Sequence, residues 1–308
     1  MKDQLSKRIN SLPVSATLAM AAKARELKAA GKDIISLSLG EPDFNTPDFI
    51  KEAAVQAIHD NYSSYSPVDG YVDLKDAIIT KFKRDNNIDY NQNQIVVSTG
   101  AKQSIANVAM VLLNPGDEVL LPAPYWVSYS AIAILCEAKF VEVPSSIDTD
   151  FKITPEQLEA AITPKTKMVF FNSPNNPSGT IYTEKEYRAL AKVLEKHPQI
   201  YILSDEIYEH INYSGKHESI AQFESIRNQV AIVNGVSKGY AMTGWRLNEN
   251  IEAQLLVPSL HANSSLPWKH LDRNNPLDFE AEMETLKSEV ASGDRERKPV
   301  FLNFTGHT

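Results

Sequence analysis

Residues 230–246 read Val-Ala-Ile-Val-Asn-Gly-Val-Ser-Lys-Gly-Tyr-Ala-Met-Thr-Gly-Trp-Arg, and this stretch is the most informative part of the chain. The apolar, β-branched run 230–233 predicts a short buried strand. Lys238 follows it in a turn of small residues, and Arg246 closes the stretch. A lysine amine at the end of a strand can form a Schiff base with a carbonyl compound, and a guanidinium can hold a phosphate group. The stretch therefore predicts a strand of a sheet with a reactive lysine beside an anion site.

On the N-terminal side of this stretch, short apolar runs alternate with helical patterns. Strands are predicted over 95–98, 118–121, 140–143, 167–171, 201–204 and 230–233. Helices are predicted over about 102–113, 126–136 and 183–196. Short β-branched strands that alternate with helices are typical of a parallel sheet with helices on both faces. We therefore expect an α/β fold built on a mostly parallel sheet.

The beginning of the chain is predicted to be mainly helical. A helix rich in Ala, Lys and Glu covers 15–30, a short strand covers 34–39, and a further helix covers 73–86. Between them, Thr46 and Pro47 predict the start of another helix, with the Thr46 hydroxyl as its cap and Pro47 at its first helical position.

The composition is that of a globular protein with no marked affinity for nucleic acids or membranes. The chain has 308 residues, of which 43% are apolar, so a sizeable core can form. The net charge of −8 argues against nucleic acid or an anionic membrane as the main partner. Because the sequence shows neither an apolar run of bilayer length nor a signal peptide, we expect a cytoplasmic protein. The one cysteine, Cys136, lies in an apolar run and is expected to be a core residue.

Polar clusters follow four of the predicted strands at the points where the strands end. These clusters are 98–102, 172–177, 205–208 and 237–238. Parallel strands end at the same edge of a sheet, where ligands bind, so we expect the clusters to form one site. An isolated Asp205 is more often a helix cap or surface carboxylate, and an isolated Lys238 is more often a solvated amine. Their occurrence together, in strand-end positions, favours a functional site.

Three further motifs have both a structural and a functional interpretation. Gly100-Ala101-Lys102 joins a strand to a helix, and such a turn can bind phosphate or be glycine-rich only for steric reasons. Asn176 stands in Asn-Asn-Pro-Ser-Gly, which forms a tight turn by itself. Trp126, taken alone, is more often a packing residue than a surface for stacking.

Together these segments resemble the fold-type-I pyridoxal phosphate-dependent aminotransferases, in particular the bacterial aspartate aminotransferase branch. The resembling motifs fall in family order across residues 12–247. They include Pro-Tyr-Trp-Val-Ser-Tyr at 124–129, Asn-Asn-Pro-Ser-Gly at 175–179 and Ser-Asp-Glu-Ile-Tyr at 204–208. The resemblance implies pyridoxal 5′-phosphate as cofactor, no metal, an amino acid and a 2-oxo acid as substrates, and a homodimer.

The resemblance also implies roles for individual residues. Lys238 is the catalytic residue, which carries the cofactor as a Schiff base and then moves the α-proton of the substrate. Asp205 faces the pyridine nitrogen, Tyr208 and Asn176 face the phenolic oxygen, and Trp126 lies over the ring.

Other residues are implied at the cofactor phosphate and at the substrate. The remaining cofactor-binding residues are Gly100, Ala101, Lys102, Ser237, Arg246 and, from the neighbouring subunit, Tyr65. Substrate contacts are implied for Gly40, Trp126 and Asn176.

The resemblance ends after Leu247. Members of the family continue into another strand, dimer-forming helix and a small domain that carries an arginine for the substrate carboxylate. No arginine of the tail stands in a matching context. We therefore expect an N-terminal arm or small-domain segment over 1–45, an incomplete cofactor-binding large domain over 46–247, and an unrelated tail over 248–308, with the carboxy-terminal small domain missing.

The tail has a weak resemblance of its own. Residues 298–308 resemble the strand that enters the redox motif of thioredoxin-like domains, but the tail has no cysteine. A broken or fused reading frame is the interpretation that this sequence favours.

The expected function is transfer of an amino group from an aspartate-like amino acid to a 2-oxo acid. Two alternatives remain. Another fold-type-I enzyme, such as a C–S lyase or a decarboxylase, would share nearly every cofactor residue. An inert cofactor-binding fragment would share them too, without turnover.

Overall fold

The structure is a computed structural model, and it describes residues 5–13, 16–35, 40–213 and 215–245. The chain divides into two units, Met1–Gln254 and Leu255–Thr308, and every described residue belongs to the first. Arg246, most of the predicted strand 34–39 and the predicted tail 248–308 lie outside the described residues. In the described part of the chain, none of the helices is both long enough and apolar enough to cross a membrane.

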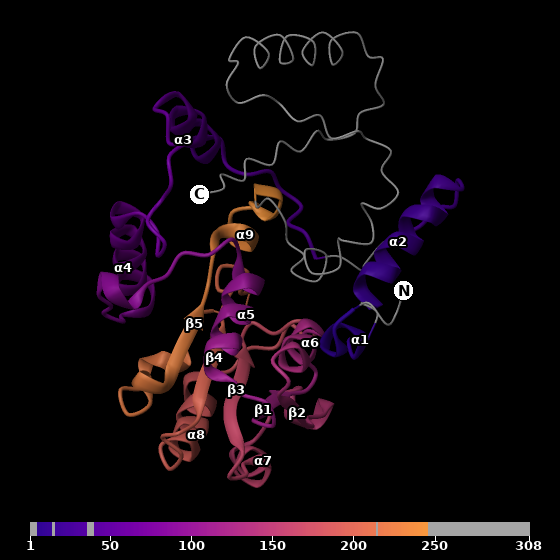
Figure 1. Ribbon diagram of the computed structural model, residues 1–308, viewed down its shortest axis with the longest axis vertical. Helices are drawn as coiled ribbons and strands as arrows, with labels where there is room; N and C mark the ends of the chain where they lie inside the picture. Colours follow the sequence, from indigo (N-terminus) through magenta and orange to yellow (C-terminus); the bar gives the residue numbers. More distant parts are fainter. Residues whose placement is uncertain (1–4, 14–15, 36–39, 214, 246–308) are drawn as a thin grey trace. The chain divides into compact units, whose positions relative to one another are not determined.

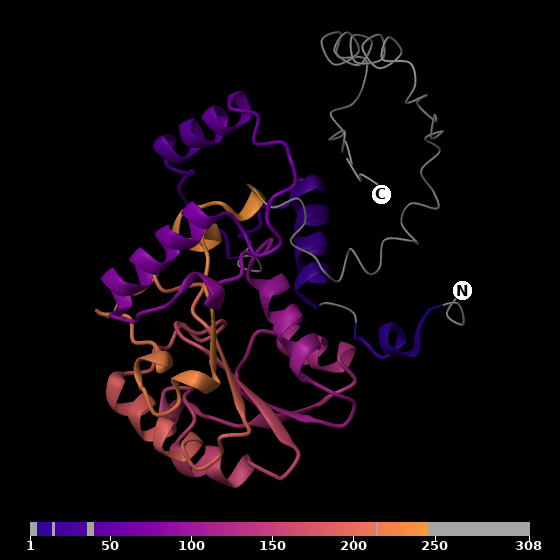
Figure 2. The ribbon, with the colours of Figure 1, turned by 60° about the vertical axis from the view of Figure 1, so that its left-hand side comes forward.

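A five-stranded parallel sheet forms the centre of the described chain, as the alternating pattern predicts (Figure 1). Its order is β2-β1-β3-β4-β5, and every neighbouring pair is parallel. The strands are β1 Glu118–Pro122, β2 Lys139–Val143, β3 Thr166–Asn172, β4 Tyr201–Asp205 and β5 Val230–Val233. The strands of this sheet run between two layers of helices (Figure 2).

Alternate residues of the strands build two separate cores, one on each face of the sheet. Leu120 and Val169 face α7 (Pro155–Ala161) and α8 (Glu184–Leu194). Their chain neighbours Leu121 and Phe170 face α5 (Ala101–Leu112) and α6 (Ser128–Leu135). Each of these four strand side chains is at most 2% exposed, and burial of one such side chain contributes about 1.5–3 kcal/mol. The near-continuous apolar sequence of the strands follows from this burial on both faces.

The first part of the chain is helical, with α1 (Lys7–Asn10), α2 (Ala16–Ala29), α3 (Asp48–His59) and α4 (Val72–Asn86). Of the later elements, α7 does not appear among the predictions although its start is well marked. Thr154 caps it in a capping box with Gln157, and Pro155 occupies its first turn. Short 3₁₀ turns complete the described elements, namely η2 Gln92–Gln94, η3 Ile147–Thr149, η4 Ile220–Gln222, η5 Arg227–Gln229 and η6 Thr243–Trp245.

The strand predicted over 95–98 does not form in the described chain. The N–H group of Val97 donates to the carbonyl of Asp69 at 3.1 Å, in a loop, and Val96 is 69% exposed. The Val97 side chain packs against Gly70 so closely that a Cβ at Gly70 would come within 2.5 Å of it. The prediction was wrong because a β-branched run becomes a strand only where a partner strand takes up its backbone groups.

The predicted cap of α3 is also wrong. Pro47, not Thr46, occupies the N-cap position of α3, and no side chain caps the helix there. The Thr46 hydroxyl instead donates to the carbonyl of Ala241 at 2.7 Å and accepts from the Trp245 indole at 3.1 Å. The local sequence favoured a helix cap, but the Thr46 hydroxyl forms its hydrogen bonds with residues of the segment after β5 instead.

Candidate active site

The carboxyl ends of β3, β4 and β5 lie in register and define one edge of the sheet. Asn172 pairs with Asp205, and Asp205 with Val233. Two polar contacts fix this alignment beyond the strands. The Asn172 amide donates to the carbonyl of Asp205 at 2.9 Å, and the N–H of Glu206 donates to the carbonyl of Val233 at 2.8 Å. The residues that follow these strands are therefore held beside one another.

Asp205 is a buried carboxylate, 3% exposed, at the end of β4. Its Oδ2 accepts the hydroxyl of Tyr129 at 2.6 Å, and its Oδ1 accepts the N–H of Ile207 at 3.2 Å. Burial raises the pKa of Asp205 to about 6, since the two hydrogen bonds only partly offset it and the charge of Glu206 adds to it. The ionised form of such a carboxylate is stabilised when a cationic group is placed beside it.

Tyr129 was missed by the sequence analysis, although it contacts two of the predicted site residues. It is 2% exposed, and its ring packs edge-on against Trp126, with ring centroids 5.5 Å apart. Its hydroxyl reaches Asp205, as described above. The available signal was its spacing, because Tyr129 follows Trp126 by nearly one helical turn and so lies on the same face.

Removal of this hydroxyl should weaken the fold chiefly when Asp205 is ionised. We expect Tyr129→Phe, which keeps the ring contacts, to lower the free energy of unfolding at pH 8 by about 1.5–3 kcal/mol. At pH 5 the loss should be smaller, because the protonated carboxyl depends less on the donor. Urea unfolding at the two pH values measures both numbers. Equal losses at pH 5 and pH 8 would show that the hydroxyl does not stabilise the charge.

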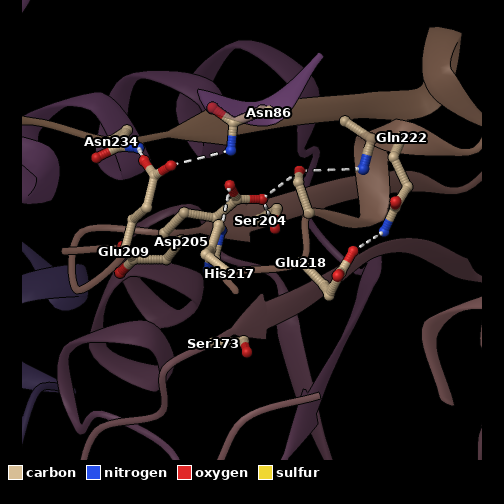
Figure 3. Close-up of polar contacts among 12 residues, drawn as sticks. Asn86, Ser173, Ser204, Asp205, Glu209, His217, Glu218, Gln222 and Asn234 are labelled. Atoms are coloured by element: carbon tan, nitrogen blue, oxygen red, sulfur yellow. Dashed lines mark hydrogen bonds and ion pairs between the residues drawn. The ribbon is translucent and has the colours of Figure 1, made fainter. Parts of the chain in front are cut away.

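A second buried carboxylate, Glu206, follows Asp205 in the sequence. Glu206 is 1% exposed. Its Oε1 accepts both the hydroxyl of Ser204 at 2.8 Å and the hydroxyl of Ser219 at 2.6 Å. The Nε2 atom of His217 lies 2.9 Å from its other oxygen. Ser204, Asp205 and His217 are labelled in Figure 3. The cluster ties residues 217–219 to the end of β4 and so supports the backbone that carries Asp205.

Trp126 and the start of α5 lie together at this edge. The Nζ atom of Lys102 lies 4.8 Å from the centroid of the Trp126 ring. Gly100 is the N-cap of α5 with φ of +101°, a backbone conformation that favours glycine, and Ala101 and Lys102 form the first turn. The positive end of this twelve-residue helix therefore faces the turn that the sequence predicts for an anion.

The asparagine turn after β3 is anchored to the same group. The N–H of Asn176 donates to Oδ1 of Asn172 at 2.7 Å. The Nδ2 of Asn175 donates to the carbonyl of Pro124 at 3.3 Å, which connects the turn to the segment that carries Trp126. Asn172, the first residue of the predicted strand-end cluster 172–177, thus bonds both Asp205 and Asn176.

Lys238 lies on the short helix α9 (Val236–Gly239), directly after β5. Its Nζ donates to the carbonyl of Gly40 at 2.8 Å, so two predicted site residues far apart in sequence are brought into contact. Ser237 beside it is 5% exposed, and Tyr208 packs against the core on the α5 side of the sheet. Tyr65 is 86% exposed, and Arg246 lies outside the described residues.

The arrangement offers three chemical functions at one sheet edge. A helix N-terminus can receive an anion, a buried carboxylate can hold a cation, and an amine can react with a carbonyl group. Trp126 supplies an aromatic surface between the helix start and the carboxylate, because it contacts both Lys102 and Tyr129.

Comparison with known proteins gives one consistent family. The model of the aminotransferase class I and II family matches residues 32–248. A probable aspartate/prephenate aminotransferase of Rickettsia bellii is 48% identical over 258 residues, which are 83% of this chain and 65% of the relative. The aspartate aminotransferase of Bacillus subtilis is 50% identical over 246 residues, which are 79% of this chain and 62% of the relative.

A solved structure shows the same fold. The crystal structure of the aspartate aminotransferase from Rhizobium meliloti superimposes with a TM-score of 0.77 at 45% identity, over 86% of this chain and 68% of that one. The match to the Rickettsia relative spans 65% of that protein's length, and the match to the Bacillus relative spans 62%.

Proposed function

The chain belongs to the class I and II aminotransferase family, and from this premise we propose that it transfers the amino group of an amino acid to a 2-oxo acid with pyridoxal 5′-phosphate as cofactor. One observation carries the proposal: the buried carboxylate of Asp205 lies at the same edge of the sheet as the turn that bears the amine of Lys238. The register of β4 and β5 holds the two together, because Asp205 pairs with the last residue of β5.

The residues of the site fit this cofactor at three points. A protonated pyridine nitrogen is the cation that suits Asp205, whose pKa burial raises to about 6. A phosphate suits the N-terminus of α5, where Gly100 lets the backbone approach closely. An aldehyde suits the amine of Lys238. The positively charged ring nitrogen is thus matched by the negative charge of Asp205, and the negatively charged phosphate by the positive end of α5.

The cofactor and the side chains divide the chemistry between them. When bound, pyridoxal phosphate withdraws electrons from the α-carbon of an attached amino acid and makes its α-proton acidic. Lys238 would bind the aldehyde through its amine and would hold and return the α-proton as a general base. Asp205 would keep a proton on the pyridine nitrogen by charge pairing. Trp126 would offer its ring as a stacking surface, and Tyr208 and Asn176 would serve as donors to the phenolic oxygen.

The proposed substrates are an aspartate-like amino acid and a 2-oxo acid. This part of the proposal rests on the relatives, whose names specify aspartate or prephenate. Gly40, whose carbonyl accepts from Lys238, is proposed to contact the substrate with Trp126 and Asn176. Arg246 is proposed as a further phosphate ligand on sequence resemblance alone.

A homodimer is the proposed assembly, with Tyr65 reaching the phosphate of the neighbouring subunit. Its exposure supports this role, because Tyr65 is 86% exposed and the nearby Val68 is fully exposed. An exposed tyrosine and valine on one loop would be covered when two copies associate.

The test is a titration of the full chain with pyridoxal phosphate, followed by addition of substrates. We expect a visible absorption band on cofactor binding, and we expect aspartate to bleach it and a 2-oxo acid to restore it. Release of ammonia or of a sulfur compound in place of that cycle would favour a lyase. A band that ignores amino acids would favour an inert cofactor-binding chain, and the absence of a band would refute the proposal.

A further inference from the structure

A third buried carboxylate, Glu209, lies beyond the end of β4. It contacts both α4 and the loop after β5. Its side chain is 4% exposed, and it receives three donors, of which Asn86 and Asn234 are labelled in Figure 3. Lys81 and Asn86 donate to it from α4, the latter at 2.9 Å, and Asn234 donates from the loop after β5 at 2.5 Å.

The charge of Glu209 is well compensated. Burial alone raises the pKa of Glu209, but the hydrogen bond and charge of Lys81, together with the amides of Asn234 and Asn86, outweigh it and lower the pKa. The group is therefore ionised at neutral pH, and an ionised acceptor forms the stronger hydrogen bonds.

Asn234 uses both ends of its side-chain amide. The Nδ2 atom donates to Glu209, while the Oδ1 atom accepts the N–H of Gly235 at 2.7 Å. The carboxylate can only accept and the backbone N–H can only donate, so the two contacts together fix the amide in one orientation. Glu209 thereby determines which atom of Asn234 faces the backbone.

Gly235 immediately precedes α9, and its place is confined. A Cβ at Gly235 would lie 3.3 Å from the Cδ1 of Ile207. The far end of α9 is confined as well, because a Cβ at Gly239 would lie 3.1 Å from the ring of His210. Gly235, which caps the four-residue turn, and Gly239, which ends it, thus pack against Ile207 and His210, and the Asn234 contact holds the N–H of the capping residue.

We propose that Glu209 and Asn234 are positioning residues for Lys238, with Glu209 orienting Asn234 and Asn234 fixing the start of the turn from which the lysine projects. The importance of that position for catalysis rests on the proposed function. Lys81 and Asn86 have a different role, since they donate to Glu209 from the α4 side.

The first experiment is amide hydrogen exchange on the full chain without cofactor. Asn234→Ala should accelerate exchange in residues 235–240 by about tenfold, because both contacts of its amide are lost. Asn86→Ala removes a donor to the same carboxylate and is the matched control, with exchange in 235–240 changed less than about twofold. Unchanged exchange in a folded Asn234→Ala variant, or equal acceleration in both variants, would overturn the proposal.

Asn234→Asp distinguishes the contact with Gly235 from the contact with Glu209. It also replaces the alanine variant in the experiment if that variant does not fold. The aspartate keeps an acceptor for Gly235 but faces Glu209 with a like charge, so we expect acceleration in the same peptide. The proposal fails if this variant exchanges at the wild-type rate.

A second readout concerns the lysine itself. With pyridoxal phosphate added, the visible band should form about tenfold more slowly in Asn234→Ala than in wild type, and at the wild-type rate in Asn86→Ala. Equal rates in all three proteins would overturn the positioning role. A wild-type chain without any band would refute the proposed function instead, and the exchange experiment would still decide whether Asn234 fixes the turn.

Discussion

Lys238→Ala should abolish the visible band of the chain with pyridoxal phosphate and should reduce transamination by at least about 1,000-fold. The physical reason is that the proposal gives one amine two tasks, to bind the aldehyde and to move the α-proton, and a general base alone contributes about 10²–10⁴-fold. Absorption spectroscopy and a coupled assay with aspartate and a 2-oxo acid measure the two losses.

The appropriate control for this variant is Lys185→Ala, which removes an exposed lysine of α8. It should retain both the band and the activity. Lys238→Ala should also keep the fold, because Lys238 is only half-buried and belongs to a short turn and to neither of the two cores. A Lys238→Ala protein that still forms the band would assign the reactive amine to another residue.

Asp205→Asn should have two opposite effects, one on function and one on stability. With cofactor and substrates, activity should fall about 100-fold to 1,000-fold, because the positively charged ring nitrogen loses its counter-charge. Without cofactor, the same substitution should stabilise the chain at neutral pH, because it removes a buried charge whose two hydrogen bonds come from neutral donors.

The pH dependence of this stabilisation follows from the raised pKa. Burial raises the pKa of Asp205 from 3.8 to about 6 in the folded chain, so the folded state holds the proton more tightly than the unfolded state. Ionisation of Asp205 therefore lowers the free energy of unfolding. The loss is small below about pH 4 and grows as the pH rises to about 6. Above that pH it stays at about 3 kcal/mol.

Urea unfolding of wild type and Asp205→Asn at pH 4.5 and pH 8, without cofactor, measures this difference. The variant should gain stability relative to wild type by about 2–3 kcal/mol between the two pH values. Glu224→Gln, at an exposed carboxylate, should show no such gain. With pyridoxal phosphate bound, the advantage of the asparagine should shrink or reverse. A gain that is independent of pH and of cofactor would contradict the assigned role of Asp205.

These two variants concern residues that the sequence identified, whereas their supports became visible only in three dimensions. Asp205 and Lys238 were recognisable because each follows an apolar strand, and strand ends of a parallel sheet share an edge. Tyr129 and Glu209 gave no comparable signal. Their importance depends on which atoms their side chains reach, and those atoms belong to distant parts of the chain.

The two wrong predictions of secondary structure have the same origin. Residues 95–98 have the composition of a strand, and Thr46-Pro47 has the form of a helix start. In the structure, Val97 donates its N–H to a loop, and Thr46 donates its hydroxyl to Ala241. Local pattern states what a segment can form, but long-range partners decide what it does form.

By itself, the sequence determined the class of fold and located all five strands of the sheet along the chain, because strands buried on both faces give continuous apolar runs. It also predicted one strand, over 95–98, that does not form among the described residues. It also determined the amine and the carboxylate of the candidate site through their positions at strand ends. Tertiary structure alone decided the spatial strand order, the charge environment of Asp205 and the contacts that hold the turn of Lys238. These depend on burial and on hydrogen-bond geometry between residues far apart in sequence, which no local pattern records.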